Sequence, residues 1–162
     1  MDYTRVTTSE EIKIISDLAY LLFPLDYGGY VRKKHIQYFL DKYQSETAIA
    51  EQLKNGYDYF IIQDGEKVSG YIGFEVDGKS LKLSKLYLNL DVRGQGIGEQ
   101  VMHWLKSYAI EKQCNRLELL VLLENKNAIR FYERLGYKSV GVFEEYFTTG
   151  YSETNYRMAQ DL

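Results

Sequence analysis

Three glycines at alternate positions mark the segment Arg93-Gly94-Gln95-Gly96-Ile97-Gly98. A backbone that lacks Cβ atoms can turn several N–H groups toward one anion. A helix that begins near Gly96 would add the positive end of its dipole and its unbonded N–H groups. Arg93 would place a further positive charge at the rim. The segment therefore predicts a phosphate cradle.

Two common nucleotide-binding patterns do not fit this segment. The dinucleotide fingerprint requires a glycine three residues after its second glycine, and Glu99 stands at that place. The ATP or GTP loop ends in Gly-Lys-Ser/Thr, whereas Gly98 is followed by Glu99-Gln100. The loop by itself also leaves open a glycine turn that binds no ligand.

Downstream, the chain carries a second block, Asn125-x-x-Ala128-Ile129-x-Phe131-Tyr132-Glu133-x-x-Gly136-Tyr137. This block and the glycine segment, which follows Leu86-Tyr87-Leu88, resemble two motifs of the GNAT N-acetyltransferase family. The first family motif is Arg/Gln-x-x-Gly-x-Gly/Ala, placed after a strand and at the start of a helix. The two blocks occur in the family's order, and the resemblance covers about Ser80 to Gly141.

The resemblance implies acetyl-CoA as the cosubstrate and no metal. In the family, the fourth strand is bulged and splays from the fifth, and the pantetheine arm lies in the opening. Leu86 and Leu88 would offer backbone groups to the pantetheine amides, and Asn125 would lie beside the arm. The amides of the glycine segment would hold the pyrophosphate. The implied cofactor-binding residues are Leu86, Leu88, Arg93, Gly94, Gly96, Gly98 and Asn125.

Tyr132 occupies the position at which the family commonly has its general acid. A thiolate leaving group has a pKa of about 8.5 if it resembles cysteine, so it needs a proton or a strong hydrogen bond. A tyrosine of ordinary pKa, about 10, gives up its proton at a cost of roughly 2 kcal/mol, which suits a donor. The alternative is that Tyr132 only packs with Phe131 and Leu135 in the core.

The general base is harder to identify. An alkyl ammonium has a pKa of about 10.4, so the free amine costs about 4–5 kcal/mol at pH 7. Family members often carry a glutamate on the bulged strand, but Ser84 stands at the matching position and cannot hold this proton. Glu75, one strand earlier, is the candidate substitute, and a solvated strand residue is the alternative. The isolated His35 and His103 give no metal-ligand pattern.

The first elements of the chain can be predicted from periodicity and capping. A short strand is expected near Tyr3–Thr7, and Thr8-Ser9-Glu10-Glu11 has the form of a capping box that starts a helix. Ser45 can cap a third helix, which Asn55-Gly56 would end. The second helix, between these two, is predicted to carry on one face Ile36, Phe39, Leu40 and Tyr43.

The rest of the chain alternates between strand and helix periods. Amphipathic helices are predicted from the glycine segment to Tyr108 and over Asn125–Leu135. This order predicts an α/β (α+β) fold with a mixed sheet. The resemblance makes that sheet mostly antiparallel, with six or seven strands and helices on both faces. The predicted strands are Tyr57–Gln63, Val68–Val76, Ser80–Leu88, Arg116–Leu123, Tyr137–Phe147 and Thr154–Gln160.

The strand Ser80–Leu88 changes the parity of its leucines. Leu81 and Leu83 share one parity, whereas Leu86 and Leu88 share the other. A half-buried strand changes faces only with an extra residue, which predicts a β-bulge near Ser84–Lys85. A strand that is buried on both faces is the alternative.

Composition limits the class of protein. At 162 residues the chain suits a single domain over residues 1–162. The net charge of −3 and the scattered Lys and Arg residues argue against a nucleic-acid partner. No segment is apolar and long enough for a membrane span, and the N-terminus does not have the form of a signal peptide. Cys114 is the sole cysteine, which fits a cytoplasmic protein.

The resemblance therefore implies an enzyme, an N-acetyltransferase that moves an acetyl group to a primary amine by direct attack in a ternary complex. The acceptor would be a small molecule or a peptide. The aromatic-rich segment Leu18–Leu53 is also similar to bacterial polyamine N-acetyltransferases. A non-catalytic acyl-CoA sensor or interaction module with the same fold is the alternative. A homodimer is expected from the family and from the aromatic residues of the last two strands.

Overall fold

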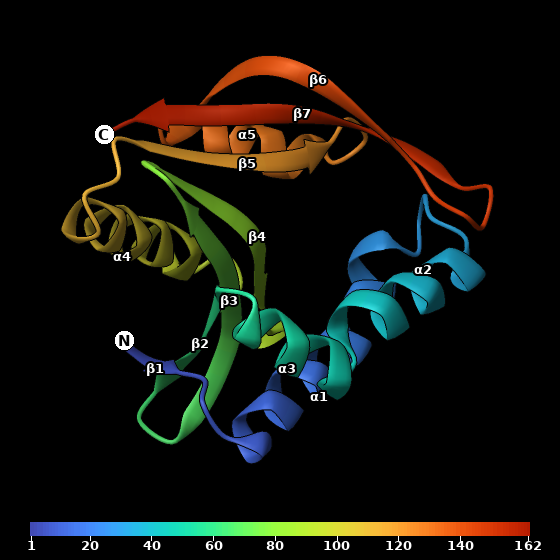
Figure 1. The fold of residues 1–162 in the computed structure, drawn as a ribbon, viewed down its shortest axis with the longest axis horizontal. Helices are drawn as coiled ribbons and strands as arrows, with labels where there is room; N and C mark the ends of the chain where they lie inside the picture. The colour runs from blue at the N-terminus through green and yellow to red at the C-terminus, as the bar shows by residue number, and fades with distance from the viewer. The chain divides into compact units, whose positions relative to one another are not determined.

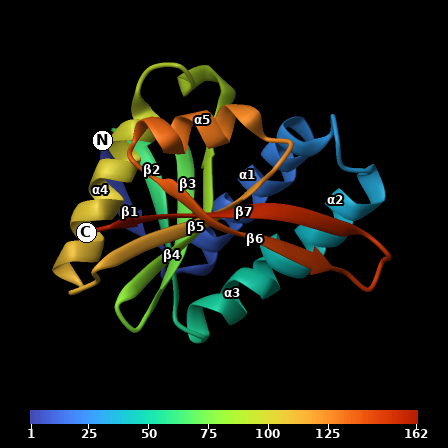
Figure 2. The same ribbon diagram turned by 90° about the horizontal axis from the view of Figure 1, so that it is seen from above.

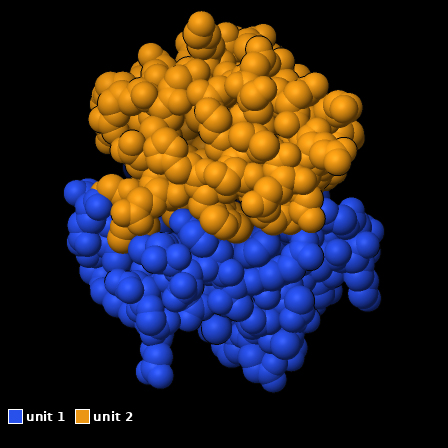
Figure 3. All heavy atoms as spheres, turned by 90° about the vertical axis from the view of Figure 1, so that its left-hand side faces the viewer, with its two compact units in different colours: residues 1–74, 85–95 blue, residues 75–84, 96–162 orange.

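The computed structural model describes all residues from Met1 to Leu162. Contacts divide the chain into two compact units, residues 1–74 with 85–95 and residues 75–84 with 96–162 (Figure 3). The prediction of one domain over residues 1–162 stays a prediction.

Seven strands form one hydrogen-bonded sheet in the order β1-β2-β3-β4-β5-β7-β6 (Figure 1). The sheet is mixed and mostly antiparallel: β1 pairs antiparallel with β2, β4 parallel with β5, and β7 antiparallel with both β5 and β6. This confirms the predicted fold class. The strands are β1 (Asp2–Arg5), β2 (Tyr57–Asp64), β3 (Lys67–Asp77), β4 (Ser80–Leu88), β5 (Arg116–Leu122), β6 (Lys138–Tyr146) and β7 (Ser152–Asp161).

Side chains cap the starts of α1 and α3, as the sequence predicts. Thr8 and Glu11 form the predicted capping box of α1, and Ser45 accepts a hydrogen bond from the amide of Ala48 at the start of α3. No helix is long and apolar enough to cross a lipid bilayer. The α-helices are α1 (Ser9–Tyr27), α2 (Lys33–Phe39), α3 (Glu46–Lys54), α4 (Ile97–Glu111) and α5 (Lys126–Arg134), and a short 3-10 turn spans Leu90–Val92.

Two predictions about the N-terminal elements need correction. The first strand ends at Arg5 rather than Thr7, although the amide of Val6 still bonds to the carbonyl of Tyr59. The second helix is α-helical only to Phe39 and continues as a π-helical turn over Leu40–Gln44. A π-helical turn shifts the residues that follow it around the helix axis. Here Gln44 lies in the core, fully buried.

Gln44 is the centre of a buried polar network in the first unit. Its Oε1 accepts a hydrogen bond of 2.6 Å from the Tyr71 hydroxyl, and its Nε2 lies 3.0 Å from the Tyr59 hydroxyl. Tyr59 in turn donates to Oε1 of Gln52 at 2.5 Å. Ser16 donates to the Gln44 carbonyl at 2.7 Å. Burial raises the pKa of Tyr71 well above its ordinary value, so this hydroxyl remains a donor.

We expect Gln44→Leu to lower the free energy of unfolding by about 1–3 kcal/mol, because the Tyr71 hydroxyl would be left without its acceptor in the core. Urea unfolding measures the change. Tyr71→Phe in the same chain should recover part of the loss, since it removes the orphaned hydroxyl. The account would be contradicted if adding Tyr71→Phe to Gln44→Leu lowered the free energy of unfolding by as much as Tyr71→Phe lowers it in the wild-type chain.

The second unit is built around β5, which has a buried face of Leu117, Leu119 and Val121. Its neighbour β7 places Met158 opposite Leu119 and Tyr156 opposite Val121, so these residues share that face. The helix α5 starts at the cap residue Asn125 and ends before Gly136, which has φ +93°. Figures 1 and 2 show β5, β7 and β6 side by side.

The strand β4 has the predicted bounds and passes from one unit to the other between Ser84 and Lys85. Its first half alternates as expected, with Leu81 and Leu83 buried. The residues from Lys85 to Leu88 are all half-buried, so they show no such alternation. The bulge at Ser84–Lys85 stays a prediction.

Candidate functional site

The glycine segment has the backbone conformation that a cradle requires. Gly94 and Gly96 have φ values of +75° and +79°. These values lie in the left-handed region, which residues with a side chain rarely adopt. A Cβ atom at either position would meet no protein atom within 4 Å. The backbone is therefore open on the side where a ligand would approach.

The N-terminus of α4 differs from that of most other helices in this chain. Side chains cap α1, α3 and α5, whereas Gly96 caps α4 without any side-chain hydrogen bond. The first N–H groups of a helix have no partner inside the helix and carry partial positive charge. At α4 they can therefore serve an anion.

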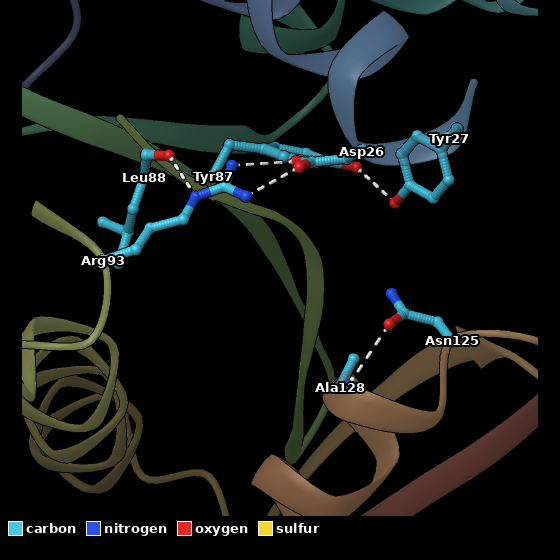
Figure 4. Close-up of polar contacts among 7 residues, drawn as sticks. All are labelled: Asp26, Tyr27, Tyr87, Leu88, Arg93, Asn125 and Ala128. Atoms are coloured by element: carbon cyan, nitrogen blue, oxygen red, sulfur yellow. Dashed lines mark hydrogen bonds and ion pairs between the residues drawn. The ribbon is translucent and has the colours of Figure 1, made fainter. Parts of the chain in front are cut away.

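Arg93 makes an interaction that the sequence did not predict. Its guanidinium binds Asp26 through two hydrogen bonds, of 2.8 Å to Oδ1 and 3.1 Å to Oδ2, and Nε donates to the Leu88 carbonyl at 3.0 Å (Figure 4). Asp26 lies near the end of α1, with 23% of its side chain exposed. The charge of Arg93 is thus balanced within its own unit, and its main effect there is to fix the end of β4.

A close backbone approach holds the end of β4 in the first unit. A Cβ atom at Gly70 would lie 2.1 Å from the Tyr87 carbonyl oxygen and 2.9 Å from the Leu88 Cα, so only glycine fits there. The amide of Asn89 bonds to the Ser69 carbonyl at 2.8 Å. These contacts position the backbone of Leu88. A glycine inside a predicted strand signals such an approach, and Gly70 could have been found by that rule.

Tyrosine side chains line the same end of the strand. The Tyr87 and Tyr27 hydroxyls lie 2.8 Å apart (Figure 4). Phe23 packs on Tyr87 with ring centroids 4.6 Å apart. Burial raises the pKa of Tyr87 well above its ordinary value, and the neighbouring Tyr27 adds to the shift. Tyr87 is therefore a neutral hydroxyl at physiological pH.

In the second unit, Asn125 has a structural role that the sequence did not predict. Its Oδ1 accepts a hydrogen bond of 3.2 Å from the amide of Ala128 and so caps α5. Its Nδ2 points away from Ala128 (Figure 4). The side chain can thus fix the start of α5 and still offer one donor to a ligand.

Tyr132 lies in the middle of α5 and is half-buried. Its ring meets those of Phe131 and Tyr137 edge to face, with centroids 5.0 and 5.9 Å away. The neighbouring Tyr137 is buried, and its burial raises the pKa of that hydroxyl to about 12. Packing thus holds the Tyr132 ring while leaving part of the side chain accessible.

Glu75 stands near the end of β3, in a cluster of charged residues. The pKa of Lys82 is raised mainly by Asp77, whose carboxylate lies 2.9 Å away, with smaller contributions from Glu118 and Glu75. In the register of β4 and β5, Lys82 stands opposite Glu118. Both residues are therefore on the face of the sheet opposite to Leu117 and Leu119.

The helix α5 lies over the face that carries Leu119, because the same groove is lined by Ile129 of α5 and by Met158, which stands opposite Leu119. The sequence suggested Glu75, which lies on β3, and Tyr132, which lies on α5, as catalytic residues. Their catalytic roles stay predictions.

Comparison with known proteins matches most of this chain to one protein family. Residues 23–137 match the model of the acetyltransferase (GNAT) family. An uncharacterized N-acetyltransferase of Mycobacterium tuberculosis (strain H37Rv) is 30% identical over 142 residues, which are 86% of this chain and 90% of that protein. The uncharacterized protein YdhI of Bacillus subtilis is 28% identical over 82 residues, and that match spans 51% of this chain and 50% of its own length.

Among solved structures, the fold is similar to that of the PaiA N-acetyltransferase from Thermoplasma acidophilum, which was crystallised in complex with coenzyme A. The TM-score is 0.79, and the similarity covers 100% of both chains at 15% sequence identity. At this identity the comparison shows that the two folds are alike.

Proposed function

Because the chain belongs to the GNAT acetyltransferase family, we propose that it transfers an acetyl group from acetyl-CoA to a primary amine. The transfer would be a direct attack of the amine on the thioester in a ternary complex. Relatives named as N-acetyltransferases and a fold neighbour that binds coenzyme A support this proposal. The residue roles are part of this proposal.

The observation that carries the proposal is the open start of α4, which no side chain caps. Gly96 has a positive φ, meets no protein atom on its Cβ side and caps the helix without a side chain. These features fit a pyrophosphate, which is large, doubly charged and best held by backbone N–H groups. The amides of the glycine segment would bind it. Glu99 is the one acidic residue in the first turn of α4.

Two further groups would hold the pantetheine arm. The backbone of Leu88 is fixed by Arg93 and by the close approach of Gly70, so its amide has a defined direction. Asn125 retains a donor after capping α5. Fixed donors lose little conformational entropy on binding, which favours tight and oriented binding of the cosubstrate.

In the transfer itself, the amine nitrogen bonds to the acetyl carbon and the C–S bond breaks. A backbone N–H near Leu88 would stabilise the oxyanion of the intermediate, and Tyr132 would donate its proton to the departing thiolate. The amine loses a proton in the same reaction. Glu75 remains the predicted base for that proton.

The experiment is a turnover assay with acetyl-CoA and a panel of polyamines, amino acids, aminoglycosides and peptide N-termini. Release of free CoA thiol, with a matching mass increase of the acceptor, is the expected result for at least one primary amine. The alternative is a non-catalytic acyl-CoA module, which Ser84 favours since it replaces the usual glutamate. Tight acetyl-CoA binding with no thiol release over the whole panel would favour that module.

A further inference from the structure

Asp26 stands in the last turn of α1, which contains no basic residue. The carboxyl end of a helix carries partial negative charge, so a carboxylate in this turn is destabilised by the helix. Only 23% of the Asp26 side chain is exposed, so water screens this repulsion incompletely. A cation from outside the helix must therefore offset it, and Arg93 is that cation.

Arg93 binds Asp26 and the backbone at the end of β4 with one planar group. Its two terminal nitrogens donate to Oδ1 and Oδ2 of Asp26 at 2.8 and 3.1 Å, and Nε donates to the Leu88 carbonyl at 3.0 Å (Figure 4). Two parallel hydrogen bonds to a carboxylate fix the plane of a guanidinium. Because Nε lies in the same plane, Asp26 sets the direction of the hydrogen bond to Leu88.

The end of α1 is itself held against β4. The Tyr27 hydroxyl lies 2.8 Å from the Tyr87 hydroxyl, and the Phe23 ring packs on that of Tyr87. Asp26 is therefore carried by an element whose place beside β4 is fixed by contacts other than its own. Groups on such rigid elements hold a site more precisely than groups on loops.

The peptide bond between Leu88 and Asn89 is held at both of its polar groups. Arg93 binds its carbonyl at 3.0 Å, and its N–H donates to the Ser69 carbonyl of β3 at 2.8 Å. Successive N–H groups of a strand point to opposite sides, so the N–H of Leu88 points away from β3. The pairing of β4 with β5, its other neighbour, covers only Ser80–Leu83. The Leu88 N–H thus has no strand partner, and its direction depends on the peptide that Arg93 holds.

The Arg93 guanidinium is already engaged, although the sequence predicts it as a charge for phosphate. Three hydrogen bonds occupy it. Turning it toward a phosphate would leave Asp26 without its cation at the end of α1. The backbone amides of the glycine segment can hold a pyrophosphate without that loss.

We propose that Asp26 is a positioning residue for acetyl transfer, which acts through Arg93 to aim the backbone at Leu88 toward the thioester. The proposal rests on the proposed function, in which this backbone serves the pantetheine arm and the oxyanion. Removal of one oxyanion donor lowers kcat by about 100- to 1000-fold in other enzymes. A donor that is still present but less well aimed should cost a part of that, about 10- to 100-fold. Affinity for acetyl-CoA should change by less than about fivefold, because the amides that hold the pyrophosphate are unaffected.

Steady-state kinetics of two variants tests this chain of contacts. Asp26→Asn removes the charge that orients Arg93, and Arg93→Lys keeps a charge but loses the planar fork. Each should lower kcat by about 10- to 100-fold. The double variant should fall within about threefold of the slower single variant, because both changes break the same chain. Asp58→Asn is the control, since Asp58 pairs with Arg5 in the same unit, is 22% exposed and should keep its kcat when changed.

Hydrogen exchange of the Asn89 amide gives a readout that does not need turnover. We expect this amide to exchange at least about tenfold faster in Asp26→Asn and at the wild-type rate in Asp58→Asn, because only the first change loosens the peptide that Ser69 binds. If the wild type releases no thiol with any amine, the proposed function fails. The exchange rate then still decides whether Asp26 positions the Leu88 backbone.

Three results would overturn the proposal in variants that keep their circular dichroism spectrum. Wild-type kcat in either single variant would show that the contact between Asp26 and Arg93 does not position the reacting groups. Tighter acetyl-CoA binding in Asp26→Asn, together with weaker binding in Arg93→Lys, would show that Arg93 serves the phosphate instead. A raised KM for the amine with unchanged kcat in Asp26→Asn would show that Asp26 binds the acceptor.

Discussion

Tyr132→Phe is expected to lower the rate constant of acetyl transfer by about a hundred- to ten-thousand-fold, the usual contribution of a general acid. The substitution removes one hydroxyl and keeps the ring that packs on Phe131 and Tyr137. Acetyl-CoA affinity and stability should therefore change little. Steady-state turnover, calorimetric affinity for CoA and the melting temperature, all on the one variant, give the measurement.

Tyr137→Phe is the matched control for this prediction. Its ring lies 5.9 Å from that of Tyr132 and its hydroxyl is buried, so the same atom is removed nearby. We expect this variant to keep its turnover and to lose at most about 1 kcal/mol of stability. Wild-type turnover in Tyr132→Phe, with an amine whose chemical step limits the rate, would end the assignment of Tyr132 as the acid.

Gly96→Ala is expected to weaken acetyl-CoA binding by about 10- to 100-fold. The added methyl group meets no protein atom, so it occupies the open side on which the pyrophosphate would lie. Hydrogen bonds to a charged group contribute about 1.5–3 kcal/mol each, and 1.4 kcal/mol corresponds to tenfold in affinity. Isothermal titration calorimetry with CoA measures the loss.

Gly56→Ala controls for backbone strain in this experiment. Gly56 has φ +96°, and a Cβ atom there also meets nothing within 4 Å. Both variants should lose about 1 kcal/mol of stability, because alanine is strained at positive φ. Only Gly96→Ala should lose affinity for CoA. Equal affinity in the two folded variants would reject the phosphate cradle.

The sequence by itself determined the features that depend on short stretches of chain. The capping box at Thr8 and the helix cap at Ser45 follow from local hydrogen bonds between neighbouring residues. The strand Ser80–Leu88 and the glycine segment follow from side-chain periodicity and from residues without a Cβ atom. The family was also recognisable, because its two motifs lie in a fixed order on successive local elements.

Tertiary structure decided the features that depend on residues far apart in the chain. Asp26 binds Arg93 across the first unit, and Gly70 meets the backbone of Tyr87, but no local pattern ties either pair together. The π-helical turn at Gln44 forms where Tyr59 and Tyr71 provide partners from two strands. These outcomes depend on which elements pack together, and a single sequence read locally does not contain that information.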